Sequence, residues 1–298
     1  MKTYSLNDGR FFPNGKEQET DMENYKEYLT EQQNEASMHI DRMSALEIAQ
    51  VINKEDKKVA DAVETQLPSI ARAIDEIAAR LKNGGRLVYI GAGTSGRLGV
   101  IDATECPPTY GVSPELVQGI IAGGKDAMFY SAEGAEDSAE HAVLDLKKIS
   151  FSEKDVCFGL SASGSAAYVC GALRYAKELG ALTVALSCRG GSAISQIADI
   201  AITPEVGAEV ISGSTRMKAA TAQKMVLTTV STGVMVKLGR VSGNLMVYMH
   251  PSNIKLKNRA VRMIVTETGA SEEEARQALE QCGYSVSDAI ARLRGSKA

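Results

Sequence analysis

The sequence predicts an α/β fold, a doubly wound five-stranded parallel sheet with N-terminal helices and a small C-terminal helical bundle. Two observations predict it. Short apolar runs alternate with helical stretches between residues 86 and 202, as expected for repeated βα units with both sheet faces covered. Two of these runs lead into Gly/Ser-rich loops, at 91–96 and 161–164, each followed by a helix start. In such folds, ligands bind at the carboxyl ends of the strands.

The individual elements follow from the apolar patterning along the chain. The five expected strands are 86–90, 116–122, 155–160, 182–187 and 199–202. Helical periodicity predicts helices at 45–52, 59–81, 97–103, 134–148, 166–179 and 193–197. A longer helix is expected over 217–238, with Ser214 or Thr215 as its N-cap.

Composition shifts predict three parts. Residues 1–42 are polar and predict an N-terminal arm, 43–250 hold the α/β domain with its flanking helices, and 251–298 form a charged tail. The tail predicts a small helical bundle, because Ser271 and Glu274 form a capping-box pattern and Gly283 follows as a stop signal.

Bulk properties exclude several classes of protein. The net charge of −4 gives no general attraction to nucleic acid or to an anionic membrane. The least charged stretch, 225–236, is far shorter than the roughly 20 apolar residues of a membrane helix, and Met1 begins no apolar signal sequence. Five scattered cysteines fit reduced thiols, and three histidines without ligand spacing predict no metal site. We therefore expect a cytoplasmic protein.

The segment that follows the first strand predicts an anion cradle. Gly91, Gly93 and Gly96 allow a sharp turn and a close backbone approach, and Thr94 and Ser95 add hydroxyl donors. A helix expected to start near residue 97 would point its amide groups and its dipole at a bound anion. Further on, a carboxylate in the string TECPP (104–108) is expected where this helix gives way to a proline-rich turn. A carboxylate close to a phosphate cradle suggests chemistry as well as binding.

Six strings, in this order and spacing, resemble the N-acetylmuramic acid 6-phosphate etherase family. They are GAGTSGRLG (91–99), DATECPPTYG (102–111), IAGG (121–124), EGAED (133–137), GSTRMKA (213–219) and TAQK (221–224). The resemblance covers about residues 30–290 and implies the sugar isomerase (SIS) fold, with a tail similar to a ubiquitin-associated (UBA) bundle. It implies cleavage of the D-lactyl ether of N-acetylmuramic acid 6-phosphate without cofactors, in a homodimer whose site lies near the subunit interface.

The resemblance also implies residue roles. Glu105 matches the acid that protonates the departing lactate, and Glu136 matches the base that removes the C2 proton. The residues expected to bind the phosphate and the sugar hydroxyls are Thr94, Ser95, Ser161, Ser163, Ser165, Ser214 and Lys218.

The chain departs from the family pattern at two places. The second loop usually reads AASGRTPY, but here Ser165, Ala166 and Ala167 replace Arg, Thr and Pro, and Tyr248 stands where an acidic residue is usual. The added serine makes this loop similar to that of glucokinase regulatory proteins. A non-catalytic phosphosugar sensor is therefore an alternative function, and an aldose–ketose phosphate isomerase of the same fold is a third.

Overall fold

The computed structural model describes residues 31–295, and its centre is a five-stranded parallel sheet with strand order β2-β1-β3-β4-β5. The strands are β1 (Leu87–Gly91), β2 (Val117–Ile121), β3 (Val156–Leu160), β4 (Leu182–Leu186) and β5 (Ile200–Ile202). All five predicted strands are confirmed, each with ends within one residue of the expectation. The chain passes from β1 to β2 on one side and then to β3 on the other. The topological switch point therefore lies between β1 and β3.

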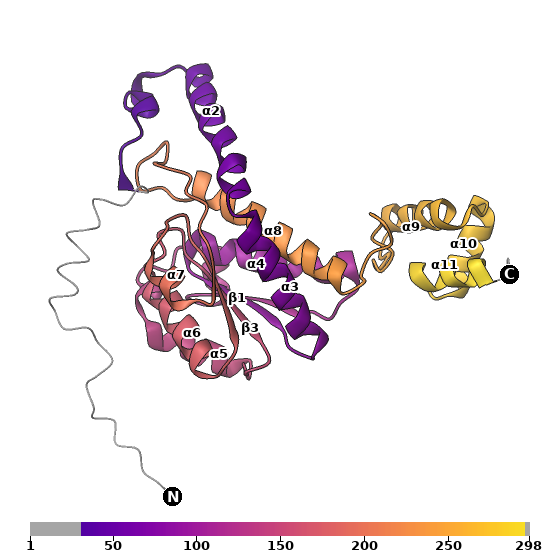
Figure 1. Cartoon of the computed structure of the whole chain (residues 1–298). Helices are drawn as coiled ribbons and strands as arrows, with labels where there is room; N and C mark the ends of the chain where they lie inside the picture. The colour runs from indigo at the N-terminus through magenta and orange to yellow at the C-terminus, as the bar shows by residue number, and fades with distance from the viewer. Residues whose placement is uncertain (1–30, 296–298) are drawn as a thin grey trace, which may run out of the picture.

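Helices cover both faces of this sheet (Figure 1). They are α2 (Ala45–Glu64), α3 (Leu67–Lys82), α4 (Gly93–Tyr110), α5 (Ala139–Lys148), α6 (Ala167–Glu178), α7 (Ala193–Ile197) and α8 (Lys218–Lys237). Helices α3, α4 and α8 share one apolar core with Leu87, Phe158 and Val184 of the sheet. Helices α5, α6 and α7 pack on the opposite face, against Val88 and Cys157. The doubly wound prediction is therefore confirmed.

Helix α4 is longer at both ends than the expected 97–103. It starts at Gly93, runs through Pro107 and Pro108 and ends at Gly111, whose φ of 62° is left-handed. The prolines predicted a turn because proline removes a backbone donor and strains a helix interior. Here they lie in the last turn, and the Gly111 amide closes the helix on the Pro107 carbonyl at 2.9 Å. The expectation that Glu105 precedes a proline-rich turn was therefore wrong, since it lies within the helix.

Other boundaries also differ. Helix α2 continues through 53–58, and the break before α3 falls at Thr65 and Gln66, just ahead of Pro68 in the first turn of α3. The expected helix 134–148 is divided into a 3₁₀ turn (Ala135–Asp137) and α5, because Ser138 caps α5 by accepting from the His141 amide.

Two glycines let α4 start directly against the strand ends. A Cβ on Gly96 would lie 2.6 Å from the Gly91 carbonyl oxygen and 2.8 Å from a side-chain carbon of Ile121. Neither approach is possible for a larger residue without movement of β1 or β2. The helix N-terminus is thereby held at the carboxyl edge of the sheet.

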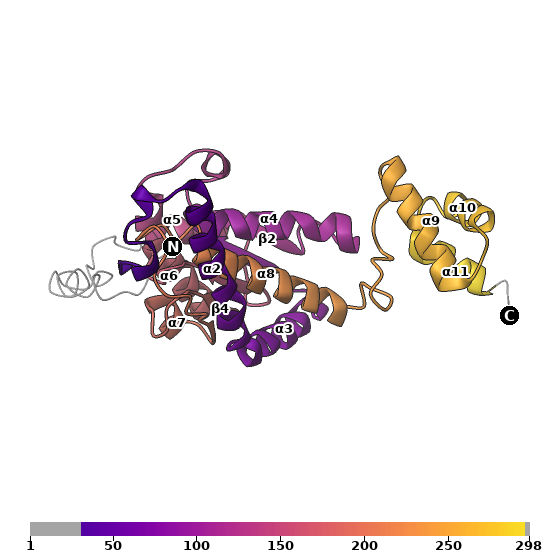
Figure 2. The same cartoon turned by 90° about the horizontal axis from the view of Figure 1, so that it is seen from above.

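The C-terminal helices form their own core. Helices α9 (Ile254–Thr268), α10 (Glu272–Gln281) and α11 (Val286–Gly295) pack around Ala260, Ile264, Leu279 and Ile290. This bundle lies apart from the sheet (Figures 1 and 2). The N-terminal end of α2 also projects away from the sheet, at a different place on the molecule (Figure 1). The predicted capping box of Ser271 and Glu274 is confirmed. Between residues 31 and 295, no helix combines the length and apolar character needed to cross a bilayer.

Candidate active site

Three strand ends meet at one edge of the sheet. Gly91 pairs in register with Ile121 of β2 and with Leu160 of β3. The loops that follow β1, β2 and β3 therefore leave the sheet side by side. This arrangement places the first turn of α4 and the Gly/Ser-rich loop after β3 next to the switch point, where doubly wound folds bind ligands.

The first turn of α4 presents backbone donors without a side-chain cap at this edge. Its N-cap, Ala92, has no side chain that could accept from the first-turn amides, and these amides have no acceptor within the helix. Thr94 is half-buried and Ser95 is buried in the same turn. An anion here would meet backbone donors and the positive end of the helix dipole.

A pocket of about 280 Å³ opens between the start of α4 and the segment that joins β2 to α5. Gly93 and Arg97 line it from α4, while Glu133 and Glu136 line it from the joining segment. Glu136 is exposed, so its carboxylate is accessible to a ligand. The pocket thus combines free backbone donors on one wall with carboxylates on the other.

Glu105 does not belong to this pocket within one chain. It lies twelve residues beyond Gly93 on α4, which corresponds to about 18 Å along the helix axis. Its side chain is exposed, one turn beyond Ile101, which is 53% exposed. Within one chain, Glu105 is therefore not among the residues that line the pocket containing Glu136.

The loop after β3 is braced by its own hydroxyls. Ser161 accepts from the Gly164 amide at 3.1 Å, and the hydroxyls of Ser163 and Ser165 lie 2.9 Å apart. Gly164 has a φ of +73°, and a Cβ there would lie 2.3 Å from Cβ of Ser192. Ser163 remains half-buried and Ser165 exposed, so both hydroxyls can reach a ligand at this edge.

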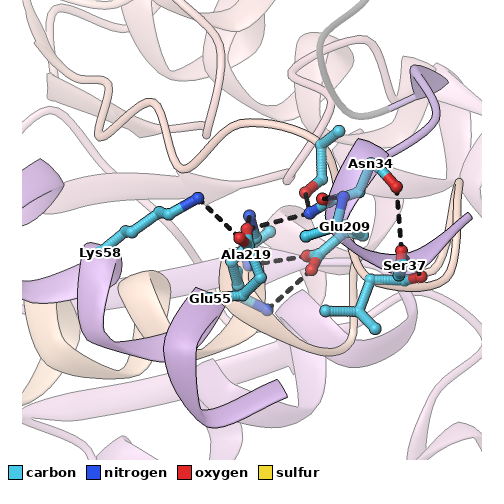
Figure 3. Close-up of polar contacts among 10 residues, drawn as sticks. Asn34, Ser37, Glu55, Lys58, Glu209 and Ala219 are labelled. Carbon is cyan, nitrogen blue, oxygen red and sulfur yellow. Dashed lines mark hydrogen bonds and ion pairs between the residues drawn. The ribbon is translucent and has the colours of Figure 1, made fainter. Parts of the chain in front are cut away.

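Lys218 belongs to an ionic cluster centred on the buried Glu55. The other members are Asn34, Lys58 and Glu209, which Figure 3 labels together with Glu55. Its ammonium donates to Glu55 at 2.7 Å, and both side chains are 2% exposed. Glu55 also accepts from Lys58 at 2.6 Å and from Asn34 at 2.9 Å. Burial works against the charged carboxylate, but the hydrogen bonds from Lys218, Lys58 and Asn34 outweigh it and lower the pKa of Glu55 to about 2. None of the seven predicted binding residues, Lys218 included, is among those that line the pocket.

Glu209 caps α8 in place of the predicted N-caps. It accepts from the amides of Lys218 and Ala219 at 3.0 and 2.9 Å, while the N-cap residue, Met217, makes no side-chain cap. The expectation that Ser214 or Thr215 caps this helix was therefore wrong, because a carboxylate nine residues upstream occupies the donors. Burial raises the pKa of Glu209. Ser214 is half-buried in the segment just before α8.

Sequence reasoning missed the contacts that hold these elements in place, and it assigned Lys218 to the ligand instead. Glu55 and Lys218 are 163 positions apart, and no local pattern joins them. Asp102 is a second case: it accepts from Ser231 of α8 at 3.1 Å, and burial raises its pKa. Its spacing of three from Glu105 would have suggested only a shared helix face. Among residues 31–295, no group of three or more His, Cys, Asp or Glu side chains is placed to hold a metal ion.

Two protein-family sequence models match the chain. The model of the SIS domain matches residues 131–232, and that of the glucokinase regulatory protein N-terminal SIS domain matches residues 69–177. A protein of E. coli CFT073, solved as a ligand complex, shares the fold, with a TM-score of 0.50 and 17% identity over 68% of this chain and 97% of that one. The fold and these matches define the chain as an SIS-domain protein.

Curated relatives narrow the class further. N-acetylmuramic acid 6-phosphate etherase of Clostridium beijerinckii is 57% identical over 267 residues, which cover 90% of this chain and 88% of that protein. The etherase of Caldanaerobacter subterraneus subsp. tengcongensis is 54% identical over 270 residues, or 91% and 88% of the two chains. The chain belongs to the N-acetylmuramic acid 6-phosphate etherase family.

Proposed function

We propose that this chain is a carbon–oxygen lyase that cleaves the D-lactyl ether of N-acetylmuramic acid 6-phosphate, giving N-acetylglucosamine 6-phosphate and D-lactate. The observation that carries the proposal is the pocket that faces Glu136 toward the uncapped first turn of α4, in a chain of this family. We also infer a cytoplasmic site of action, because its five cysteines are free thiols.

The chemistry requires two acid/base groups. In the open-chain sugar, the C1 aldehyde acidifies the C2 proton, and Glu136 removes it. The electron pair of the resulting enolate expels the lactate oxygen from C3, and that oxygen takes a proton from Glu105. Glu105 then activates water, which adds to C3 of the unsaturated aldehyde, and the proton returns to C2. Positioned carboxyl groups are suited to both proton transfers.

The phosphate would be held by the backbone and hydroxyl donors at the sheet edge. Thr94 and Ser95 would contribute from the first turn of α4, and the serines of the β3 loop, which follows the neighbouring strand, would contribute from the other side of the switch point. The binding set in this proposal is Thr94, Ser95, Ser161, Ser163, Ser165, Ser214 and Lys218. Lys218 would act at longer range than the others, since its ammonium is bonded to Glu55.

The separation of the two glutamates supports a homodimer with shared sites. Glu105 lies about 18 Å along α4 from the turn that forms the pocket, beyond the reach of a sugar bound beside Glu136. The exposed Ile101 lies on the same helix, one turn before Glu105. We infer that a second copy of this chain presents Glu105 to the pocket that contains Glu136, so that each site uses both subunits.

Release of D-lactate from N-acetylmuramic acid 6-phosphate tests the activity. Wild type should release D-lactate, whereas Glu105→Gln and Glu136→Gln should each be inactive. If the sites are shared, mixing the two variants and allowing subunit exchange should restore about a quarter of the wild-type activity, since half the dimers are mixed and each carries one intact site. Recovery of no activity after verified exchange would refute the shared site.

The regulator alternative makes a different prediction. A phosphosugar sensor would bind the sugar phosphate but release no D-lactate above the level of the Glu105→Gln variant. The curated etherases, at 53–57% identity over about nine-tenths of the chain, favour the lyase, although residues 69–177 match the regulatory-protein model. The D-lactate assay therefore separates the two functions directly.

A further inference from the structure

We propose that Arg97 is a positioning residue that fixes the acidic wall of the pocket, residues 131–137, against the start of α4. This inference rests on the proposed function, since it concerns the placement of Glu136. The hydrogen bonds of Arg97 go to backbone carbonyls of the segment that carries Glu136, and not to that carboxylate itself. Arg97 would therefore set where the carboxylate lies without itself taking part in proton transfer.

The guanidinium of Arg97 spans the two walls of the pocket. Its Nε donates to the carbonyl of Met128 at 3.1 Å, and its Nη2 donates to the carbonyl of Tyr130 at 3.0 Å. Both acceptors lie just before the pocket-lining residues 131–136, and Arg97 itself lines the pocket. One side chain in the second turn of α4 thus ties together segments that are 31 to 33 positions apart.

Arginine suits this task because its planar fork presents several donors in fixed directions, whereas a lysine ammonium is a single point charge. Near Tyr130, the amides of Phe129 and Tyr130 both donate to the Asp126 carbonyl of the same segment, and farther along Ala135 packs against the core beside α6. Phe129 and Tyr130 are 84% and 74% exposed, so burial of their side chains contributes little to holding the segment. The downstream bonds, from Ala135 to the Ala132 carbonyl and from Asp137 to the Gly134 carbonyl, are internal to the segment.

The consequence for catalysis follows from the position of Glu136. It lies six residues beyond Tyr130, in the 3₁₀ turn Ala135–Asp137, and must face a sugar whose phosphate is bound by α4. Loss of the Arg97 bonds removes the tie between α4 and the stretch just before Glu136, so we expect the carboxylate to move relative to C2. A displacement on the order of 1 Å can lower a rate by about 100-fold. The phosphate-binding amides of α4 are untouched, and Arg97→Lys keeps the positive charge at the pocket, so anion affinity should stay the same in that variant.

The test combines kinetics with hydrogen exchange on Arg97→Lys and Arg97→Gln in the full chain. Arg80→Lys is the matched control: Arg80 also donates to a loop carbonyl, that of Glu153 at 2.7 Å, but that loop precedes β3 at the opposite edge of the sheet. In both Arg97 variants, amides 124–138 should exchange about 10-fold faster or more, and kcat should fall by about 10–100-fold, less for Lys than for Gln. In Arg97→Lys, which keeps the charge, inhibition by inorganic phosphate should change by less than about 2-fold, and the control should change neither exchange nor kcat.

Three results would overturn the inference. Unchanged exchange at 124–138 would show that Arg97 does not hold the segment. A large rise in the phosphate inhibition constant would make Arg97 a direct phosphate ligand, and a rise in KM with unchanged kcat would make it a substrate contact. The exchange measurement needs no substrate. It therefore decides the role of Arg97 even if wild type releases no D-lactate, an outcome that would refute the proposed function separately.

Discussion

Replacing Glu55 by glutamine should destabilise the protein by about 3 kcal/mol, because it leaves the buried Lys218 ammonium without its carboxylate partner. Both side chains are 2% exposed and their charged atoms are 2.7 Å apart. Breaking a buried pair by removing one member typically costs about 3–5 kcal/mol. We expect the lower end of that range, since Glu209 accepts from the Lys218 amide and lies close enough for its charge to interact with Lys218.

Urea unfolding at neutral pH, followed by circular dichroism, measures this cost. Lys58→Gln is the matched control, because Lys58 bonds the same carboxylate at 2.6 Å but is 58% exposed, and should cost less than about 1 kcal/mol. The double variant Glu55→Gln/Lys218→Met should be more stable than Glu55→Gln alone, because no unpaired charge remains. A loss below about 1 kcal/mol for Glu55→Gln, equal to that of the control, would refute the assignment of Lys218 as a buried, charged partner.

Three further predictions concern pH and packing. The pKa of Glu55 is lowered from its ordinary 4.5 to about 2. The stability that Glu55 provides should therefore be complete above pH 4.5 and disappear as the pH falls towards 2. Over this window, the difference in urea midpoint between wild type and Glu55→Gln should shrink. Burial raises the pKa of Asp102, so the folded protein binds the carboxyl proton of Asp102 more tightly than the unfolded chain does. The stability of the protein should therefore fall as the pH rises through the raised pKa. Asp102→Asn keeps an acceptor for Ser231 and removes this loss of stability with rising pH. Urea midpoints measured from about pH 4 to pH 7 should therefore show the variant to be at least as stable as wild type near pH 7. Gly96→Ala should cost about 1–3 kcal/mol in thermal or urea unfolding and reduce D-lactate release, because its Cβ would lie 2.6 Å from the Gly91 carbonyl; a neutral effect would contradict the close approach of α4 to β1.

The sheet could be predicted from the sequence because its signal is local. Each strand is a short apolar run bounded by glycines or polar residues, and parallel strands buried on both faces need no alternation. The N-terminal part of the site was predictable for the same reason, since Gly91 to Gly96 encode a turn and a helix start in six residues. The sequence predicted a doubly wound sheet but not the order of its strands, because the pairing of β1 with β3 joins residues about 70 positions apart.

The extent of α4 could not be predicted, because the effect of proline depends on where a helix ends. Pro107 and Pro108 read as breakers, yet the helix closes at Gly111 just beyond them. What keeps the helix intact to that point is tertiary packing: Ala103 and Cys106 are buried in the core shared with α8. A residue-by-residue pattern contains no information about that partner helix.

The ionic cluster was hidden for a related reason. Glu55 and Lys58, spaced by three on a polar helix, have the pattern of an exposed pair that contributes little to stability. The partner that changes this interpretation is Lys218, 163 positions away, and Asn34 adds a hydrogen bond from a further segment. The burial of Glu55 results from the convergence of three segments, none of which shows an unusual composition.

The extent of α4 also decides how the two glutamates can act together. Because Gly91 and Gly96 fix the start of the helix at the strand ends, the place of Glu105 follows from helix geometry and lies outside the pocket of its own chain. The same helix supplies Arg97, which ties the segment of Glu136 to the pocket. Helix α4 therefore holds the segment of Glu136 through Arg97, while it places Glu105 outside the pocket. For both to act on one sugar, as we propose, the second carboxylate would come from the α4 of another copy.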